Sequence, residues 1–158
     1  MDSTDISFHF ILLIEVGNYM HELVEISENT ATRFVKLKNV YTSIVDECFD
    51  DSAVVSERNF GFMQIGQQYE CKIKLFGKPS DKRMRGSVVC TVIDKEATIG
   101  EKPMVEVRVN DEKYYIAKKK VEEYLSRDYF YFFSTRKDLV QVNDVIHADF
   151  EENSQHIS

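Results

Sequence analysis

Tyr69-Glu70-Cys71-Lys72-Ile73-Lys74-Leu75 is the most informative part of the chain, because every second side chain in it is apolar and the others are charged. In an extended strand, this alternation turns one set of side chains toward a core and the other toward water. Comparable segments follow at residues 87–93, 104–110, 113–116, 129–134 and 139–147. Their succession predicts a small, strongly curved antiparallel β-structure over residues 68–150.

A single helix is expected to interrupt these strands. In residues 118–127, Val121, Tyr124 and Leu125 have i, i+3, i+4 spacing, which predicts a short helix with one apolar face. The resulting element order resembles that of an OB-type five-stranded barrel, in which the helix follows the third strand. The resemblance covers element order only and has no sequence motif behind it. An SH3-like barrel, or an open antiparallel sheet that carries a helix, would give a similar order.

The N-terminal third also has a strand-like pattern. Residues 21–26 and 32–38, joined by the turn-prone Ser27-Glu28-Asn29-Thr30, predict an antiparallel hairpin. Residues 39–49 could continue as a strand, and the acidic residues around Cys48 are expected to end it. We expect irregular structure at 53–62 and loops at 77–86 and 94–103. The expected fold class is therefore α+β, mainly β: a small antiparallel barrel with a strand-rich N-terminal extension.

Length and composition fit one soluble domain of 158 residues, 43% hydrophobic and 30% charged. We expect a single domain over residues 1–158, with an acidic extension at 1–60, a barrel-like core at 68–150 and a flexible tail at 151–158. The apolar segment 8–14 is too short to span a bilayer and has no basic residue before it. We therefore expect no membrane association and favour a strand there; alternatively, the natural chain begins at Met20.

No catalytic or metal-binding motif is apparent. Cys48, Cys71 and Cys90 lack CxxC spacing, which indicates reduced thiols in a cytoplasmic protein. The four histidines are dispersed, and there is no Gly-x-Ser-x-Gly turn or Walker loop. The acidic neighbours of Cys48 should raise its pKa, which disfavours a catalytic thiolate. We expect no catalytic residue, no metal and no cofactor; a pocket of convergent titratable side chains would be evidence for an enzyme.

The charge is unevenly distributed along the chain. The formal net charge is −7, yet residues 1–57 carry −8 and residues 58–150 carry +3. The densest acidic group lacks the EF-hand pattern and contains Asp46, Glu47, Asp50 and Asp51. We interpret it as a solvated acidic loop or, if functional, as part of a docking face for a basic partner protein.

The strongest positive signal is a basic loop between the first two strands expected in the barrel. Its four bases are Lys78, Lys82, Arg83 and Arg85. In OB folds, the corresponding loop helps to grip single-stranded nucleic acid, with bases on phosphates and aromatic side chains under the nucleobases. The candidate stacking residues are Phe76, Tyr114 and Tyr115. The alternative is that the bases only keep an exposed loop soluble.

Five aromatic residues occur in succession as Tyr129-Phe130-Tyr131-Phe132-Phe133. In a strand, the first, third and fifth point to one side, and the second and fourth to the other. We favour burial of both sides, between the barrel and the N-terminal hairpin. If one side is left uncovered, Tyr129 and Tyr131 become part of an exposed contact surface.

The function expected from these features is non-catalytic binding. Our first hypothesis is a protein–protein interaction, inhibitor-like or adaptor-like, through the acidic or the aromatic surface. The second hypothesis is nucleic-acid binding by the basic loop, and the third is an enzyme of unknown type. The sequence does not indicate the oligomeric state.

Overall fold

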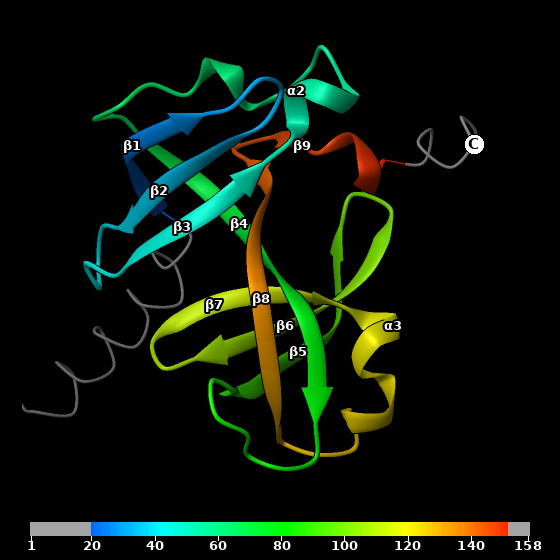
Figure 1. The fold of residues 1–158 in the computed structure, drawn as a ribbon. Helices are drawn as coiled ribbons and strands as arrows, with labels where there is room; N and C mark the ends of the chain where they lie inside the picture. The colour runs from blue at the N-terminus through cyan, green and yellow to red at the C-terminus, as the bar shows by residue number, and fades with distance from the viewer. Residues whose placement is uncertain (1–19, 152–158) are drawn as a thin grey trace, which may run out of the picture.

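The computed structural model of the protein describes residues 20–151, and within them nine strands form one sheet that closes in a ring (Figure 1). The strands are β1 (Met20–Glu28), β2 (Arg33–Asn39), β3 (Val45–Asp50), β4 (Gln68–Ser80), β5 (Val88–Ile99), β6 (Lys102–Val109), β7 (Glu112–Ala117), β8 (Tyr129–Val142) and β9 (Val145–Ile146). The short helices are α2 (Ser52–Val55), η1 (Phe60–Phe62), α3 (Lys118–Val121), η2 (Glu122–Tyr124) and η3 (Ala148–Phe150). The expectation of a mainly β chain with a short helix after residue 117 is confirmed.

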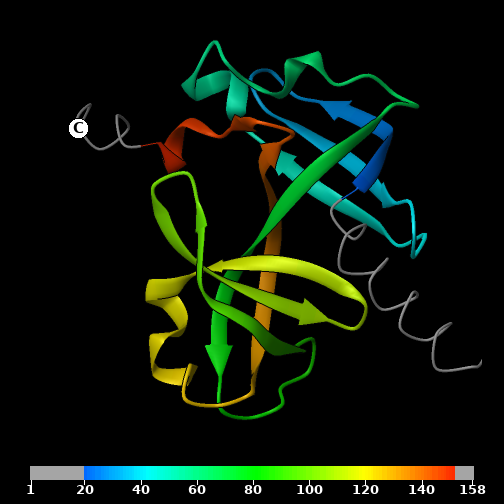
Figure 2. The ribbon, with the colours of Figure 1, turned by 180° about the vertical axis from the view of Figure 1, so that it is seen from behind.

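The long strands β4 and β8 connect the two halves of the sheet. They pair in antiparallel fashion from Cys71 opposite Val142 to Ser80 opposite Tyr131. On one side β1 pairs with β4, β2 with β1 and β3 with β2, and each of these pairs is antiparallel. On the other side β7 pairs with β4 and β5 pairs with β8, which closes a ring through β4, β7, β6, β5 and β8. In Figure 2 the β6–β7 hairpin lies nearest to the viewer, on the side of the ring opposite to β4 and β8.

The alternation that begins at Tyr69 determines which side of β4 is buried. Cys71, Ile73 and Leu75 are at most 3% exposed and belong to a core that also takes residues from β1, β2 and β3. The lysines between them point outward and are partly exposed. A smaller apolar cluster lies under η3 and contains Ile99, Met104, Tyr115, Val140 and Phe150.

The N-terminal hairpin is confirmed as β1 and β2, but residues 39–49 do not continue as one strand. A turn at residues 40–43 intervenes, with Ser43 at a φ of 65°. Asp46 and Glu47 lie within the next strand, contrary to expectation, whereas β3 does end at Asp50; Asp46 and Asp50 are 4% exposed. They tolerate burial because Lys137 and Arg33 form ion pairs with them.

Three expected boundaries were wrong because strand pairing extends beyond the alternating pattern. β4 continues through Ser80 and β5 through Ile99, so the predicted loops are shorter. Residues 129–134 and 139–142 belong to a single strand, β8, with a bulge at Thr135, and residues 145–146 form the separate strand β9. The polar residues 134–137 of β8 remain extended because β4 satisfies their backbone groups.

The helix follows the strand at residues 112–117, as expected, but it is shorter than expected, and its place differs from that in the OB-type order. α3 and η2 together cover residues 118–124, not 118–127. They follow the fourth strand of the ring, β7, whereas the OB-type order places the helix after the third. The number of strands on each side of the helix explains this difference from the OB-type order. Four strands of the ring (β4, β5, β6 and β7) precede the helix, and one, β8, follows it where two were expected.

Two expectations fall on residues that the structure does not describe. They are the strand at 8–14 and the tail from residue 152 onward. Over residues 20–151, no helix has the length and apolar character needed to cross a membrane.

Candidate functional site

Aromatic and basic side chains share the outer side of β4 and β8. Phe76 lies opposite Arg136, Lys78 opposite Phe133, and Ser80 opposite Tyr131. Residues directly opposite each other in an antiparallel ladder point to the same side. We call this surface the β4–β8 face; it comprises Lys74, Phe76, Lys78, Tyr131, Phe133 and Arg136, together with Asp138, which lies opposite Lys74 and is mostly buried. Figure 1 shows β4 and β8 in front of the other strands of the ring.

The centre of the β4–β8 face is Phe76, whose ring is 40% exposed. Lys120 Nζ, on α3, lies 4.4 Å from the ring centroid, and the Arg136 guanidinium carbon lies 5.0 Å from it. Burial lowers the pKa of the neighbouring Lys74, and the positive charges of Lys120 and Arg136 lower it further, against the opposing effect of Asp138. Three bases, Lys74, Lys120 and Arg136, therefore surround an exposed aromatic ring, and one acid, Asp138, forms ion pairs with Arg136 and Lys74.

The basic loop adjoins this face. Lys78 belongs to β4, whereas Lys82, Arg83 and Arg85 are exposed in the loop that leads to β5. A Cβ atom added to Gly86 would lie 3.2 Å from the Phe133 ring, so the end of the loop passes beside that ring. The structure thus places the basic loop beside the aromatic segment 129–133, although the two were expected to be separate surfaces.

The aromatic strand is not buried on both sides, contrary to the favoured expectation. Phe130 and Phe132 are at most 1% exposed, but Tyr129 is 51% exposed and Phe133 37%. Tyr131 is half-buried, with its ring 6.0 Å from that of Tyr129. The N-terminal strands do not cover this side, because β3 reaches β8 only near Asp138, at the other end of the strand.

The other two stacking candidates are unavailable. Tyr114 and Tyr115 are buried, and their hydroxyl groups donate hydrogen bonds to Asp46 and Glu106. Of the three candidates, only Phe76 is exposed.

The acidic group does not form a common docking face. Asp46 pairs with Lys137, Asp50 with Arg33, and Asp51 lies 2.6 Å from His147 Nε2. Glu47 is exposed on the opposite side of β3 from Asp46. Throughout residues 20–151, no three or more His, Cys, Asp or Glu side chains are grouped so that they could hold a metal ion.

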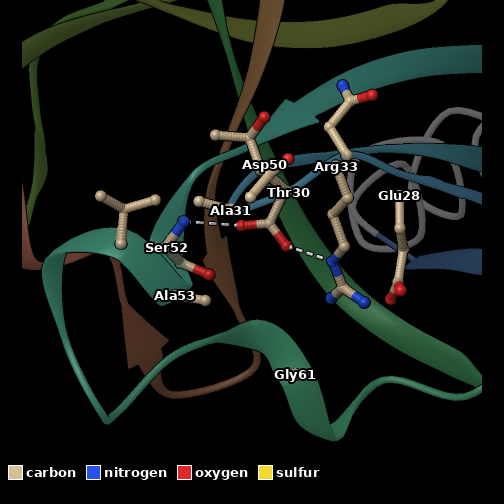
Figure 3. Close-up of a pocket in the computed structure, with 11 residues that line it drawn as sticks. Glu28, Thr30, Ala31, Arg33, Asp50, Ser52, Ala53 and Gly61 are labelled. Carbon is tan, nitrogen blue, oxygen red and sulfur yellow. Dashed lines mark hydrogen bonds and ion pairs between the residues drawn. The ribbon is translucent and has the colours of Figure 1, made fainter.

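A cavity of about 450 Å³ lies between the β1–β2 turn and α2 (Figure 3). Arg33 Nε donates to Asp50 Oδ2 at 2.7 Å, and Asp50 Oδ1 accepts from the backbone N–H of Ser52 at 2.9 Å. Arg33 Nη2 also donates to the carbonyl oxygen of Phe60. These bonds attach α2 and η1 to β2, so we assign the Arg33–Asp50 pair a structural role.

A second cavity, of about 500 Å³, contains a cluster of titratable side chains. We call it the Asp46 pocket; its buried or half-buried titratable members are Asp46, Glu112, Tyr114 and Lys137, and Asp111 is an exposed member of its lining. Burial, with Asp46 adding to the effect, raises the pKa of Tyr114 well above its usual range, so this hydroxyl stays a neutral donor. Burial likewise raises the pKa of the Cys48 thiol. Neither group is activated as a nucleophile.

The buried Glu112 carboxyl makes the stability depend on pH. Burial raises its pKa, as does Asp46, while hydrogen bonds from Thr42 and Asn39 and the charge of Lys137 oppose the shift. The folded chain therefore binds this proton more tightly than the unfolded chain does, and stability falls as pH rises from the unfolded value of 4.5 through the folded pKa. We expect the wild type to lose stability relative to Glu112→Gln over that interval. Urea unfolding from about pH 4 to pH 8 measures this difference, and a difference that stays constant with pH would contradict the assignment.

Some of these residues could not be found by inspecting the sequence. The exposed position of Lys74 could have been predicted, because the alternation that begins at Tyr69 places it on the outer side of β4. Arg136, Lys120 and Glu112 carried no local signal, since their neighbours come from distant segments. No family model, no curated protein and no solved structure matches this chain.

Proposed function

We propose that the protein is a non-catalytic binding module whose contact surface is the β4–β8 face. The observation that carries this proposal is the pairing of exposed aromatic rings with bases across one ladder, Phe76 with Arg136 and Phe133 with Lys78. Neighbouring apolar side chains that stay exposed on a protein surface often mark the site where a partner binds. The free, buried Cys48, Cys71 and Cys90 accord with a cytoplasmic location.

The ligand that fits this face best is a single-stranded nucleic acid. Lysine and arginine bind phosphates, and exposed aromatic rings stack on bases, at about 1–3 kcal/mol per base. Asp138 forms ion pairs with Arg136 and Lys74, and Asp81 of the basic loop is paired with Arg127, so Lys78, Lys82, Arg83 and Arg85 are the bases that we expect to bind phosphates. The closed ring would serve as a barrel-like scaffold, in the manner of OB-type folds, despite the different place of its helix.

The second candidate is the protein–protein interaction. Val89 lies opposite Tyr131 on β5 and is 44% exposed, and Met84 in the basic loop is 56% exposed. Such apolar side chains extend the face beyond what phosphates and bases require. They fit a partner protein that offers both acidic and apolar groups.

The proposal predicts salt-dependent binding of single-stranded oligonucleotides that depends on the basic residues. We expect replacement of Lys78, Lys82, Arg83 and Arg85 by alanine to weaken binding at least about tenfold and to reduce the slope of log K against log salt by about 3. Fluorescence anisotropy with labelled DNA and RNA oligonucleotides measures both quantities.

The matched control removes four bases elsewhere. The four control positions are outside the β4–β8 face and the basic loop. Lys36 and Lys38 lie on β2, Arg58 lies between α2 and η1, and Lys95 lies on β5. Their replacement by alanine changes the net charge equally and should leave the slope within about 1 of the wild type. Equal losses in both variants, or no binding by the wild type, would reject the nucleic-acid proposal.

A further inference from the structure

The Asp46 pocket lies away from the outer side of β4 and β8, between the β2–β3 turn and the β6–β7 turn. Its walls are largely apolar and consist of Tyr41, Ile44, Val88 and Val109. Tyr41 and Ile44 are 51% and 49% exposed, so they stand at the mouth. The volume of about 500 Å³ falls within the range of small-molecule sites.

The floor of the pocket contains two carboxylates but one ammonium group. Asp46 is ion-paired with Lys137, and its other oxygen accepts a hydrogen bond of 2.7 Å from the Tyr114 hydroxyl. Glu112 accepts from Asn39 Nδ2 at 2.9 Å and from the Thr42 hydroxyl. Both of its donors are neutral, and over residues 20–151 no ion pair with Glu112 is present. With Glu112 ionised, the floor therefore has one negative charge in excess.

Two turns with left-handed residues hold the walls in place. Ser43 has a φ of 65° in the β2–β3 turn, and Asn110 a φ of 55° in the β6–β7 turn. The Asn39 side chain joins the two turns, because Oδ1 accepts from the backbone N–H of Tyr41 at 2.8 Å while Nδ2 reaches Glu112. A cavity held in this way is largely preformed, which reduces the entropic cost of binding.

We propose that the Asp46 pocket binds a small organic cation, with an ammonium group on an apolar body. The ammonium would lie near Glu112 and supply the missing positive charge, and the apolar body would contact Ile44, Val88 and Val109. The Tyr41 ring stands at the mouth, where it can cover the ligand. Burial raises the pKa of Glu112 in the free protein, and a bound ammonium group beside it would favour the ionised carboxylate. This proposal is independent of nucleic-acid binding by the β4–β8 face.

The test uses 2-phenylethylamine as the probe and isothermal titration calorimetry on the full chain. The neutral isostere 2-phenylethanol and the anion phenylacetate have a similar body without the positive charge. We expect the amine to bind the wild type at least about tenfold more tightly than either of them. We also expect Glu112→Gln to weaken amine binding about tenfold, because it removes the excess negative charge while keeping the side-chain size.

Two further variants make the result decisive. Glu47→Gln removes the same charge from the outward side of β3 and should leave amine binding unchanged. Ile44→Trp should block the mouth and abolish binding without disturbing the core, since Ile44 is half exposed. The proposal is overturned if the alcohol binds as well as the amine, if Ile44→Trp binds the amine normally, or if the amine does not bind. Oligonucleotide binding should be the same in all three variants, which separates this proposal from the function proposed above.

Discussion

Gly77→Ala is expected to destabilise the fold strongly. The new Cβ would lie 1.9 Å from the carbonyl oxygen of Phe133 and 3.0 Å from the Cα of Ser134. Both atoms belong to the backbone of β8, so no side-chain rotation can make room. Overpacking costs about 1–3 kcal/mol where side chains can adjust. Here β4 and β8 must separate, and we expect a loss of about 3 kcal/mol or more in the free energy of unfolding.

Urea denaturation followed by circular dichroism measures this loss. The control is Gly61→Ala, whose Cβ would meet only the side-chain oxygen of Asn59, at 2.9 Å. That side chain can rotate, so a much smaller loss is expected. If the Gly77 and Gly61 variants were equally stable, the close approach of β4 and β8 would be disproved, and with it the closure of the ring.

Phe132→Ala is expected to cost about 3–5 kcal/mol, because it leaves a cavity in the core. The Phe132 side chain is 0% exposed and its ring lies 6.5 Å from that of Phe130. It faces the inside of the ring, opposite Val88 on β5 and Pro79 on β4. Thermal and urea unfolding measure the loss.

The adjacent Phe133 provides a matched control on the same strand. It points outward and is 37% exposed, so Phe133→Ala should cost about 1 kcal/mol or less. The same variant should weaken oligonucleotide binding by about 1–3 kcal/mol, because it removes a stacking ring. Equal stability losses at the two positions would mean that the inner and outer sides of β8 are wrongly assigned.

Local alternation predicted the strands well but not where they end. The pattern in residues 69–75 and the alternating burial of Phe130 and Phe132 follow from period-two geometry alone. The extensions of β4 and β8 depend on pairing between segments about sixty positions apart. No window of sequence contains that information. The burial of Asp46 and Asp50 has the same origin, since Lys137 and Arg33 come from other strands.

The members of the candidate site were only partly predictable for the same reason. Lys78, Arg85 and Tyr131 were identified by residue type and position, but as parts of different surfaces. Their juxtaposition follows from the β4–β8 ladder, and so does the inclusion of Arg136. The Glu112 cluster joins β2, β3, β7 and β8, and no single segment carries its pattern.

The most direct test of the binding account is a map of backbone amide chemical shifts during titration with a single-stranded oligonucleotide. The account predicts that the largest changes occur in Phe76–Ser80 of β4, in Tyr129–Phe133 of β8 and in the basic loop at 81–87. Changes confined to β1, β2 and β3, or no change at a saturating concentration of the oligonucleotide, would contradict it.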